Sequence, residues 1–221
     1  GVTLATLFVG PKPAGRHSVR WDAAGYPDGR YRIVVTAVGP RGRQVSASVA
    51  VVVSRTLSGF AVAPSAISPN GDGRSDAFTL TYSLAVPAQA RIALRRGTVE
   101  AAVLFDGAVS AGPSALTWGG SVRDGDYTLA LTVADHNGAV TQTETVRVDR
   151  VGPRLVRVSR RPLRISLSEP ARVTFIADGV VSTVVRARAG PFRVVLDRPF
   201  TRLDAFGEDA AGNVGPRVRL Q

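Results

Sequence analysis

The feature that most constrains this chain is a sequence pattern that recurs about 97 residues further along. The first copy contains Leu7, Phe8, Trp21, Asp28, Gly29 and Tyr31, and the second contains Leu104, Phe105, Trp118, Asp124, Gly125 and Tyr127. A chain that repeats itself at such a period folds as an array of similar units. The repeat therefore sets the domain organisation before any single motif does.

The second pattern is strict alternation of apolar and polar residues over short runs, broken by Gly, Pro, Asn and Asp. In the second copy these runs are Thr79–Leu84, Ala90–Leu94, Ala101–Phe105, Leu116–Trp118, Tyr127–Ala134 and Val140–Val148. A period of two predicts β-strands with one buried face. Several such strands in a unit of roughly 70–95 residues are typical of an antiparallel β-sandwich.

A looser third copy follows the second. Its Leu167–Pro170 segment resembles Leu84–Pro87, and its Asp209–Gly212 segment resembles Asp135–Gly138, although it lacks the Trp and the Asp-Gly-x-Tyr turn. We therefore predict an all-β protein of tandem immunoglobulin-like β-sandwich domains. The expected domains are residues 1–56, 57–150 and 151–221. The Val151–Pro153 segment is expected to be a short, stiff joint because proline fixes φ, so the domains would form a rod.

The first domain is expected to lack its first strands. Residues 57–98 of the second copy lie ahead of the point that matches Gly1, and the first copy has nothing equivalent. Half a sandwich would expose an apolar face and unpaired strand edges. The domain is a smaller variant, or the chain is a fragment of a longer protein, or another chain supplies strands by complementation. We favour the fragment explanation.

The repeated motif resembles the Ig-like domain of bacterial flagellar hook-capping proteins, a domain type found in many secreted and cell-surface proteins. The residues that carry the resemblance are Trp118, Gly119, Asp124, Gly125, Tyr127, Asp135 and Gly138, with Trp21, Asp22, Asp28, Gly29 and Tyr31 in the first copy. The third copy resembles the wider class of bacterial Ig-like repeats that close on Asp-x-Ala-Gly-Asn. The resemblance implies a fold and an extracellular or cell-surface location, whereas such modules serve many functions.

The loop Ser68–Asp76 is the best candidate metal site. Asn70, Asp72 and Asp76 offer side-chain oxygens at close spacing, and Ca²⁺ binds 6–8 oxygens in such loops. The segment resembles the loop that opens many bacterial surface Ig-like domains. It departs from an EF-hand loop at Arg74 and Thr81, so further oxygens would have to come from backbone, water or another loop. The alternative is a turn rich in Asn and Asp, without a metal.

The formal net charge of +11 comes almost entirely from arginine, and both ends of the chain are basic. The densest run consists of Arg154, Arg157, Arg160, Arg161 and Arg164. Alternation in a strand would place several of them on one face as a polyanion site, and an anionic cell-wall polymer is one candidate partner for it. Nucleic acid is not expected, because interleaved aromatic residues and a groove-binding helix are both missing from the pattern. The alternative is a solvated strand face.

We expect a non-enzymatic protein. None of the common nucleophile, zincin, phosphate-loop or dinucleotide motifs is present, and the absence of cysteine excludes thiolate chemistry. No apolar run approaches the ~20 residues that cross a bilayer, so membrane insertion is not expected. The expected function is a structural or spacer segment of a bacterial cell-surface or secreted protein. Its expected partners are other domains of the parent protein or copies of itself, with self-assembly by strand complementation as one form. The alternative is a cell-wall or polyanion-binding appendage of a secreted hydrolase.

Overall fold

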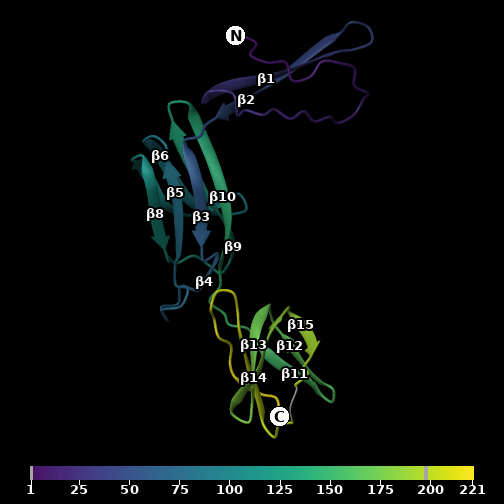
Figure 1. Ribbon diagram of the computed structural model, residues 1–221, viewed down its shortest axis with the longest axis vertical. Coiled ribbons are helices and arrows are strands. Elements are labelled where there is room, and N and C mark those ends of the chain that lie inside the picture. The colour runs from purple at the N-terminus through teal and green to yellow at the C-terminus, as the bar shows by residue number, and fades with distance from the viewer. Residues whose placement is uncertain (1, 197–198) are drawn as a thin grey trace.

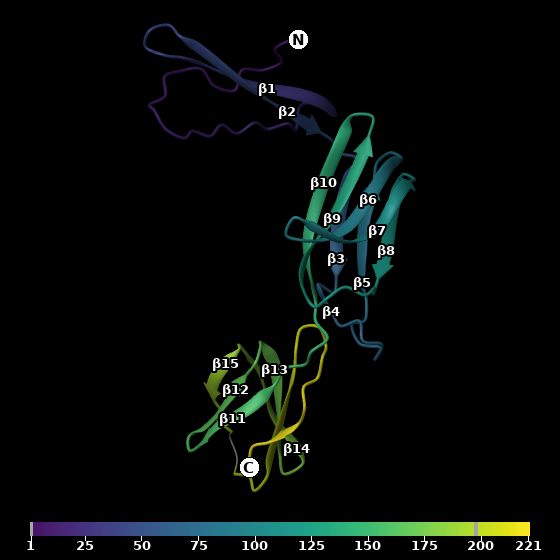
Figure 2. The ribbon, with the colours of Figure 1, turned by 180° about the vertical axis from the view of Figure 1, so that it is seen from behind.

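The computed structural model describes residues 2–196 and 199–221, and every regular element among them is a β-strand. Figure 1 shows a hairpin, a middle sandwich and a C-terminal sandwich, arranged one after another along the long axis. The view from behind in Figure 2 shows the same order. In the part of the chain that the structure describes, no helix is long and apolar enough to cross a membrane. The protein is all-β, as the alternating runs predict.

The middle domain is a sandwich of two sheets. One sheet has the order β3 (Leu57–Ala63), β5 (Phe78–Leu84) and β8 (Gly112–Trp118). The other has the order β4 (Ala66–Ile67), β10 (Gly138–Val148), β9 (Gly125–Asp135), β6 (Ala88–Arg96) and β7 (Val99–Val109). The six alternating runs that we predicted in this part of the chain each lie inside one of these strands, which confirms that they are strands.

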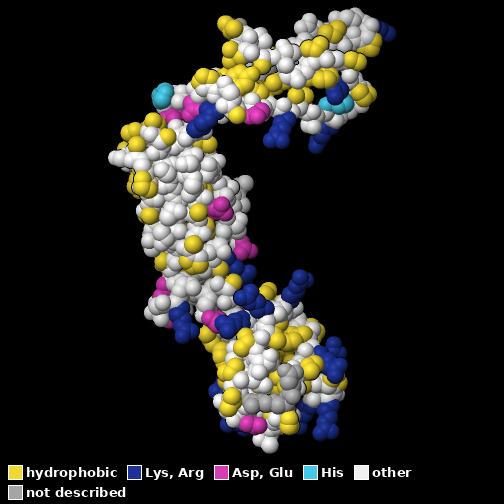
Figure 3. Space-filling view, in the orientation of Figure 1, with side chains coloured by type: hydrophobic (Ala, Val, Ile, Leu, Met, Phe, Trp, Pro, Cys, Tyr) yellow, Lys and Arg dark blue, Asp and Glu magenta, His cyan; other side chains and the backbone are white. Residues whose placement is uncertain are grey.

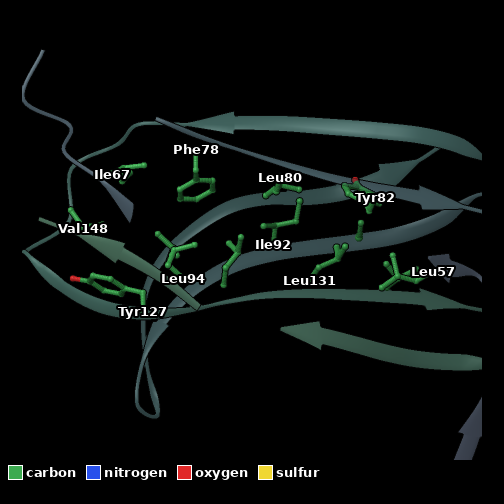
Figure 4. Packing of buried hydrophobic residues seen from close by; sticks show 14 of the residues in the cluster. Leu57, Ile67, Phe78, Leu80, Tyr82, Ile92, Leu94, Tyr127, Leu131 and Val148 are labelled. Atoms are coloured by element: carbon green, nitrogen blue, oxygen red, sulfur yellow. The ribbon is translucent and has the colours of Figure 1, made fainter. Parts of the chain in front are cut away.

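The core of the middle domain lies between these two sheets. Strand β5 buries every second side chain, namely Phe78, Leu80, Tyr82 and Leu84. In Figure 4 the labelled β5 side chains Phe78, Leu80 and Tyr82 point toward the labelled side chains of the opposite sheet, Ile92, Leu94, Tyr127, Leu131 and Val148. Each fully buried Leu, Ile or Phe contributes about 1.5–3 kcal/mol, so this cluster supplies most of the domain's stability.

Strands β4 and β10 bring the beginning and the end of the middle domain together. They pair in parallel, with Ala66 opposite Arg147 and Ile67 opposite Val148. The amide of Arg147 donates to Ser65 O at 2.8 Å, and the amide of Asp149 donates to Ile67 O at 2.9 Å. Strand β10 is also paired antiparallel with β9, from Gly138 opposite Asp135 to Val148 opposite Gly125.

The C-terminal domain repeats this arrangement with fewer strands. One sheet has the order β11 (Leu155–Arg160), β12 (Leu163–Leu167) and β15 (Gly190–Arg193). The other has the order β14 (Val180–Ala187), β13 (Ala171–Ala177), β16 (Leu203–Glu208) and β17 (Val218–Arg219). Ile165, Val173, Phe175 and Leu203 fill the space between the sheets. The order matches that of the middle domain strand for strand, apart from β4, although the sequence similarity is loose.

The N-terminal part is a hairpin rather than a two-sheet sandwich. Strands β1 (Gly29–Val38) and β2 (Gln44–Val53) pair antiparallel over their whole length, and residues 2–28 form no strand. The repeat explains this difference. Residues 2–12 and 15–21 match β7 and β8 of the middle domain, and those strands pair with β6 and β5. Among the described residues no strand lies beside residues 2–12 and 15–21 in the way that β6 and β5 lie beside β7 and β8, and these residues form no strand.

Candidate functional site

Each of the first two copies ends at an arginine that binds the aspartate of its Asp-Gly turn, and we call this contact the arginine clamp. The amide of Arg150 donates to Asp124 Oδ2 at 3.1 Å, and its guanidinium donates to Asp124 Oδ1 at 2.5 Å and to Val122 O at 2.9 Å. In the first copy the amide of Arg55 donates to Asp28 Oδ2 at 2.7 Å, and its guanidinium pairs with Asp28 Oδ1. Both clamps tie the exit of the copy to its Asp-Gly turn. The chain therefore leaves the two copies in the same local geometry.

The joint between the hairpin and the middle domain is closed by a turn of the middle domain. Thr56 Oγ1 donates to Asp135 Oδ2 at 2.5 Å. The Thr56 hydroxyl and the amide of Asn137 hold the pKa of Asp135 below its ordinary value. A Cβ on Gly138 would lie 2.9 Å from Val52 Cγ2, so this close approach requires glycine. The turn Asp135–Gly138 is thus part of the interdomain contact.

The joint between the middle and C-terminal domains uses the matching turn. Asn213, which is buried, accepts a bond from Ser68 Oγ at 2.5 Å and donates through Nδ2 to Asp149 O and Asp209 Oδ2, both at 2.8 Å. A Cβ on Gly152 would lie 2.9 Å from the backbone of Val214. The Val151–Pro153 linker is therefore packed on the C-terminal domain, and one buried side chain connects both domains.

Three carboxylates meet at this second joint. Asp149, Glu169 and Asp209 each have an oxygen within 4.8 Å of the other two. Burial raises the pKa of Glu169, and the charges of Asp149 and Asp209 raise it further. Arg147 Nη2 lies 2.8 Å from Asp149 and 3.9 Å from Glu169, so the Arg147 guanidinium forms an ion pair with both carboxylates. Carboxylate oxygens of this kind are ligands for hard cations such as Ca²⁺.

The first joint lacks this cluster. By the repeat, Ser54, Val86 and Asp135 occupy the positions of Asp149, Glu169 and Asp209. Our sequence analysis missed the cluster, because its members come from three separated segments that meet only when two domains dock. The signal that could have found it is that all three matched positions are acidic at the second joint, whereas only Asp135 is acidic at the first.

The predicted metal-binding loop holds its oxygens against its own backbone. Asp76 Oδ1 accepts from the amides of Asn70 at 3.1 Å and Gly71 at 2.8 Å, and Oδ2 accepts from Gly73 at 2.8 Å. The amides of Gly71 and Gly73 hold the pKa of Asp76 below its ordinary value. Asp72 Oδ1 accepts from the amide of Arg74 at 2.8 Å. The loop brings Asn70, Asp72 and Asp76 together, and calcium binding there stays a prediction.

The five arginine side chains of the predicted polyanion site do not all lie on the same side of the domain. Arg154, Arg160, Arg161 and Arg164 are exposed. Arg157 is opposite the buried Ile165 and donates to Leu220 O at 2.5 Å. A bulge between Arg157 and Ser159 breaks the alternation, so the run does not share one face. Polyanion binding by these five residues stays a prediction.

A second basic residue lies beside Arg164. The β12–β15 register places Arg164 directly opposite Arg193, and neither forms an ion pair within the described residues. Like charges that face each other across two strands destabilise the pair. Figure 3 shows basic side chains gathered along the side of the C-terminal domain where β11, β12 and β15 lie. An anion bound there would relieve the repulsion.

The hairpin carries an uncovered apolar face. Its register puts eight apolar residues on one side, and we call this the hairpin face: Tyr31, Ile33, Val35, Ala37, Val45, Ala47, Val49 and Val51. Val35 is 63% exposed and Val49 is 57% exposed. Trp21 and Tyr26 pack on Tyr31 with ring centroids 5.4 and 6.0 Å away, and so cover one end. Figure 3 shows hydrophobic side chains concentrated over the hairpin.

No protein-family model and no curated protein matches this sequence. Among similar solved structures are fibronectin(III)-like modules of Clostridium thermocellum CbhA, 12% identical with a TM-score of 0.37, covering 72% of this chain and 90% of theirs. A tetra-tandem repeat from the extending region of a large adhesion protein is 16% identical with a TM-score of 0.28. That match covers 90% of this chain and 58% of the adhesion fragment, so this chain spans less than two thirds of its length.

The E. coli chaperone DraB is 10% identical, with a TM-score of 0.32 and coverage of 73% of this chain and 96% of DraB. The strand order of this chain itself defines its fold. Two sheets in the same order in both sandwiches, with the Tyr127 hydroxyl donating to Arg123 O at 2.6 Å at the start of β9, are features of Ig-like domains. The resemblance to hook-capping proteins stays a prediction.

Proposed function

We propose that this chain is a non-enzymatic spacer segment of a bacterial cell-surface or secreted protein. The observation that carries the proposal is the second joint, where the buried Asn213 bonds both the Ser68 loop and the Asp149 linker. Domains that share buried polar contacts across a short linker keep a fixed relative orientation, since each lost contact leaves a buried group unpaired. The location follows from the resemblance of the repeats to those of secreted proteins.

Distances between the two sandwiches test this proposal. The chain has no cysteine, so Thr143→Cys in β10 and Val180→Cys in β14, both exposed, allow specific spin labelling. A rigid joint gives a single narrow distance distribution. An Asn213→Ala variant carrying the same labels should give a broader distribution. A broad distribution in the otherwise unchanged chain would contradict a spacer that sets distance.

The second candidate function is a cell-wall or polyanion-binding appendage of a secreted hydrolase. The Arg164–Arg193 pair favours it, because two arginines that face each other and have no ion pair with any described residue can share one anionic ligand. The test is retention of the chain on an anionic polymer, such as polyphosphate, at increasing salt. An Arg164→Gln/Arg193→Gln variant should elute at clearly lower salt than an Arg95→Gln/Arg123→Gln control of equal charge. Equal elution of the two variants would show that binding depends on net charge alone.

Calcium binding by the Ser68–Asp76 loop is a further proposal. The loop lies beside the second joint, where Arg150 Nε donates to Pro69 O at 3.3 Å. A bound ion would have to replace the amides of Gly71 and Gly73 as partners of Asp76. Titration of the chain with CaCl₂ in a calorimeter, with Asp76→Asn as the matched variant, tests it. Heat that the variant does not show would support binding in the loop.

A further inference from the structure

The middle domain shows which kind of segment covers a face like the hairpin face. By the repeat, β1 matches β9 and β2 matches β10. The β9 side chains Tyr127, Leu129, Leu131 and Val133 correspond to Tyr31, Ile33, Val35 and Ala37, and each is at most 4% exposed. In the middle domain that face is covered by the sheet that contains β3 and β5. The hairpin has the same face without the covering sheet.

The edge of β1 is also without a partner. Strand β9 pairs with β6 from Gln89 opposite Ala134 to Arg95 opposite Thr128. Within the described residues β1 pairs only with β2, so the matching edge, Arg32–Val38, is unpaired. An unpaired edge beside an uncovered apolar face exposes backbone donors and acceptors together with hydrophobic area. Both are satisfied at once by an added strand that continues into a covering sheet.

We propose that the hairpin face and the β1 edge form a docking surface for a polypeptide segment with the chemistry of β3, β5 and β6. In the docked unit, the β6-like strand adds antiparallel to Arg32–Val38, and the β5-like strand lies over Ile33, Val35 and Val49. The segment alternates apolar and polar residues, as residues 57–96 do. The inference rests on the proposed function, because the completed unit is one more module of the spacer.

The residues ahead of the hairpin support this occupant rather than a second hairpin. Residues 2–12 match β7, which needs a β6-like partner, and residues 15–21 match β8, which needs a β5-like partner. Phe8 is 46% exposed and Val19 is 53% exposed in their absence. A second copy of the hairpin provides neither partner. Docking of the proposed segment pairs both stretches and converts residues 2–21 from irregular chain to strands.

The test adds a synthetic peptide of residues 57–96 to the full chain and follows amide hydrogen exchange. Exchange at residues 32–38 should slow by about tenfold or more, and residues 2–21 should gain protection as well. An Ile33→Asp/Val35→Asp chain should lose this protection, because only the hairpin face has changed. A peptide carrying Ile92→Asp/Leu94→Asp should bind to neither chain. Exchange of the peptide into the middle domain would be unaffected by the hairpin substitutions, so the two events are separable.

A second experiment attaches the segment covalently to the chain, because the free peptide can fail to fold on its own. Residues 57–97 placed directly ahead of Gly1 reproduce the spacing of the second copy, and should yield a third cooperative sandwich with protected 32–38 amides. No protection with either the free or the tethered segment overturns the proposal. So does a chain that dimerises alone through a protected hairpin, because a second copy would then cover the face. The spin-label distance between the two sandwiches does not involve the hairpin. The spacer proposal is therefore tested independently of the docking proposal.

Discussion

The first and second copies contain the same motif in two different surroundings. In both, the tyrosine after the Asp-Gly turn donates to a carbonyl four residues earlier, Tyr31 to Pro27 at 2.7 Å and Tyr127 to Arg123 at 2.6 Å. In both, an arginine clamps the exit of the copy. Yet only the second copy forms strands over the residues that precede this turn. Local hydrogen bonds therefore follow from the motif, whereas strands and a core require the partners β5 and β6.

The largest contrast between the copies should appear on truncating matched core positions. Leu129 is fully buried in β9, and Ile33 is its counterpart in β1. Leu129→Ala should destabilise the middle domain by about 2–5 kcal/mol, because it leaves a cavity. Ile33→Ala should cost under about 1 kcal/mol, because Ile33 is only half-buried. Urea unfolding followed by circular dichroism measures both, and equal losses would show that the hairpin face is already buried in solution.

A smaller effect is expected at the joint. Asn213→Ala leaves Ser68 Oγ and Asp149 O without their partner, which should destabilise the C-terminal domain by about 1–3 kcal/mol. The control is Asn137→Ala in the first joint, where a backbone carbonyl rather than the side chain makes the contact with Arg30. Differential scanning calorimetry resolves the transitions. Equal shifts in the two variants would mean that the second joint is no tighter than the first.

The acidic cluster should make the second joint sensitive to pH. The pKa of Glu169 is raised, so the folded state holds its proton more tightly than the unfolded chain does. Stability is therefore lost as pH rises from the ordinary glutamate pKa through the folded one, and it stays low at neutral pH. Glu169→Gln should raise the melting temperature of the C-terminal domain at pH 7 by about 2 °C and have no effect near pH 3. The outcome that would refute this is an equal shift at both pH values.

The smallest expected effect is at the Ser68–Asp76 loop. The pKa of Asp76 is lowered by the amides of Gly71 and Gly73, so its contribution is present above the ordinary aspartate pKa and lost as pH falls through the folded value. Asp76→Asn should lower the melting temperature of the middle domain slightly at pH 7 and leave it unchanged at pH 2. Thermal scans at both pH values measure this, and a loss that persists at pH 2 would point to packing instead of charge.

Much of the fold was predictable, because strand positions depend on a period that is visible in the sequence. The alternation from Thr79 to Leu84 reports directly which side of β5 is buried. The directions of the arginines were less predictable, because the bulge after Arg157 shifts the alternation by one residue. The cluster of Asp149, Glu169 and Asp209 depends on how two domains dock, and no local pattern encodes that geometry.

The parallel pairing of β4 with β10 has a mechanical consequence. Strand β4 lies near the beginning of the middle domain in sequence and β10 lies at its end. A force that pulls the two ends of the chain apart therefore acts on these two strands in opposite directions. Because they run parallel, the force is directed along the strands, and the bonds of Arg147 to Ser65 and of Asp149 to Ile67 are strained together rather than one after another. A module tied in this way resists extension under tension until both bonds give way at once.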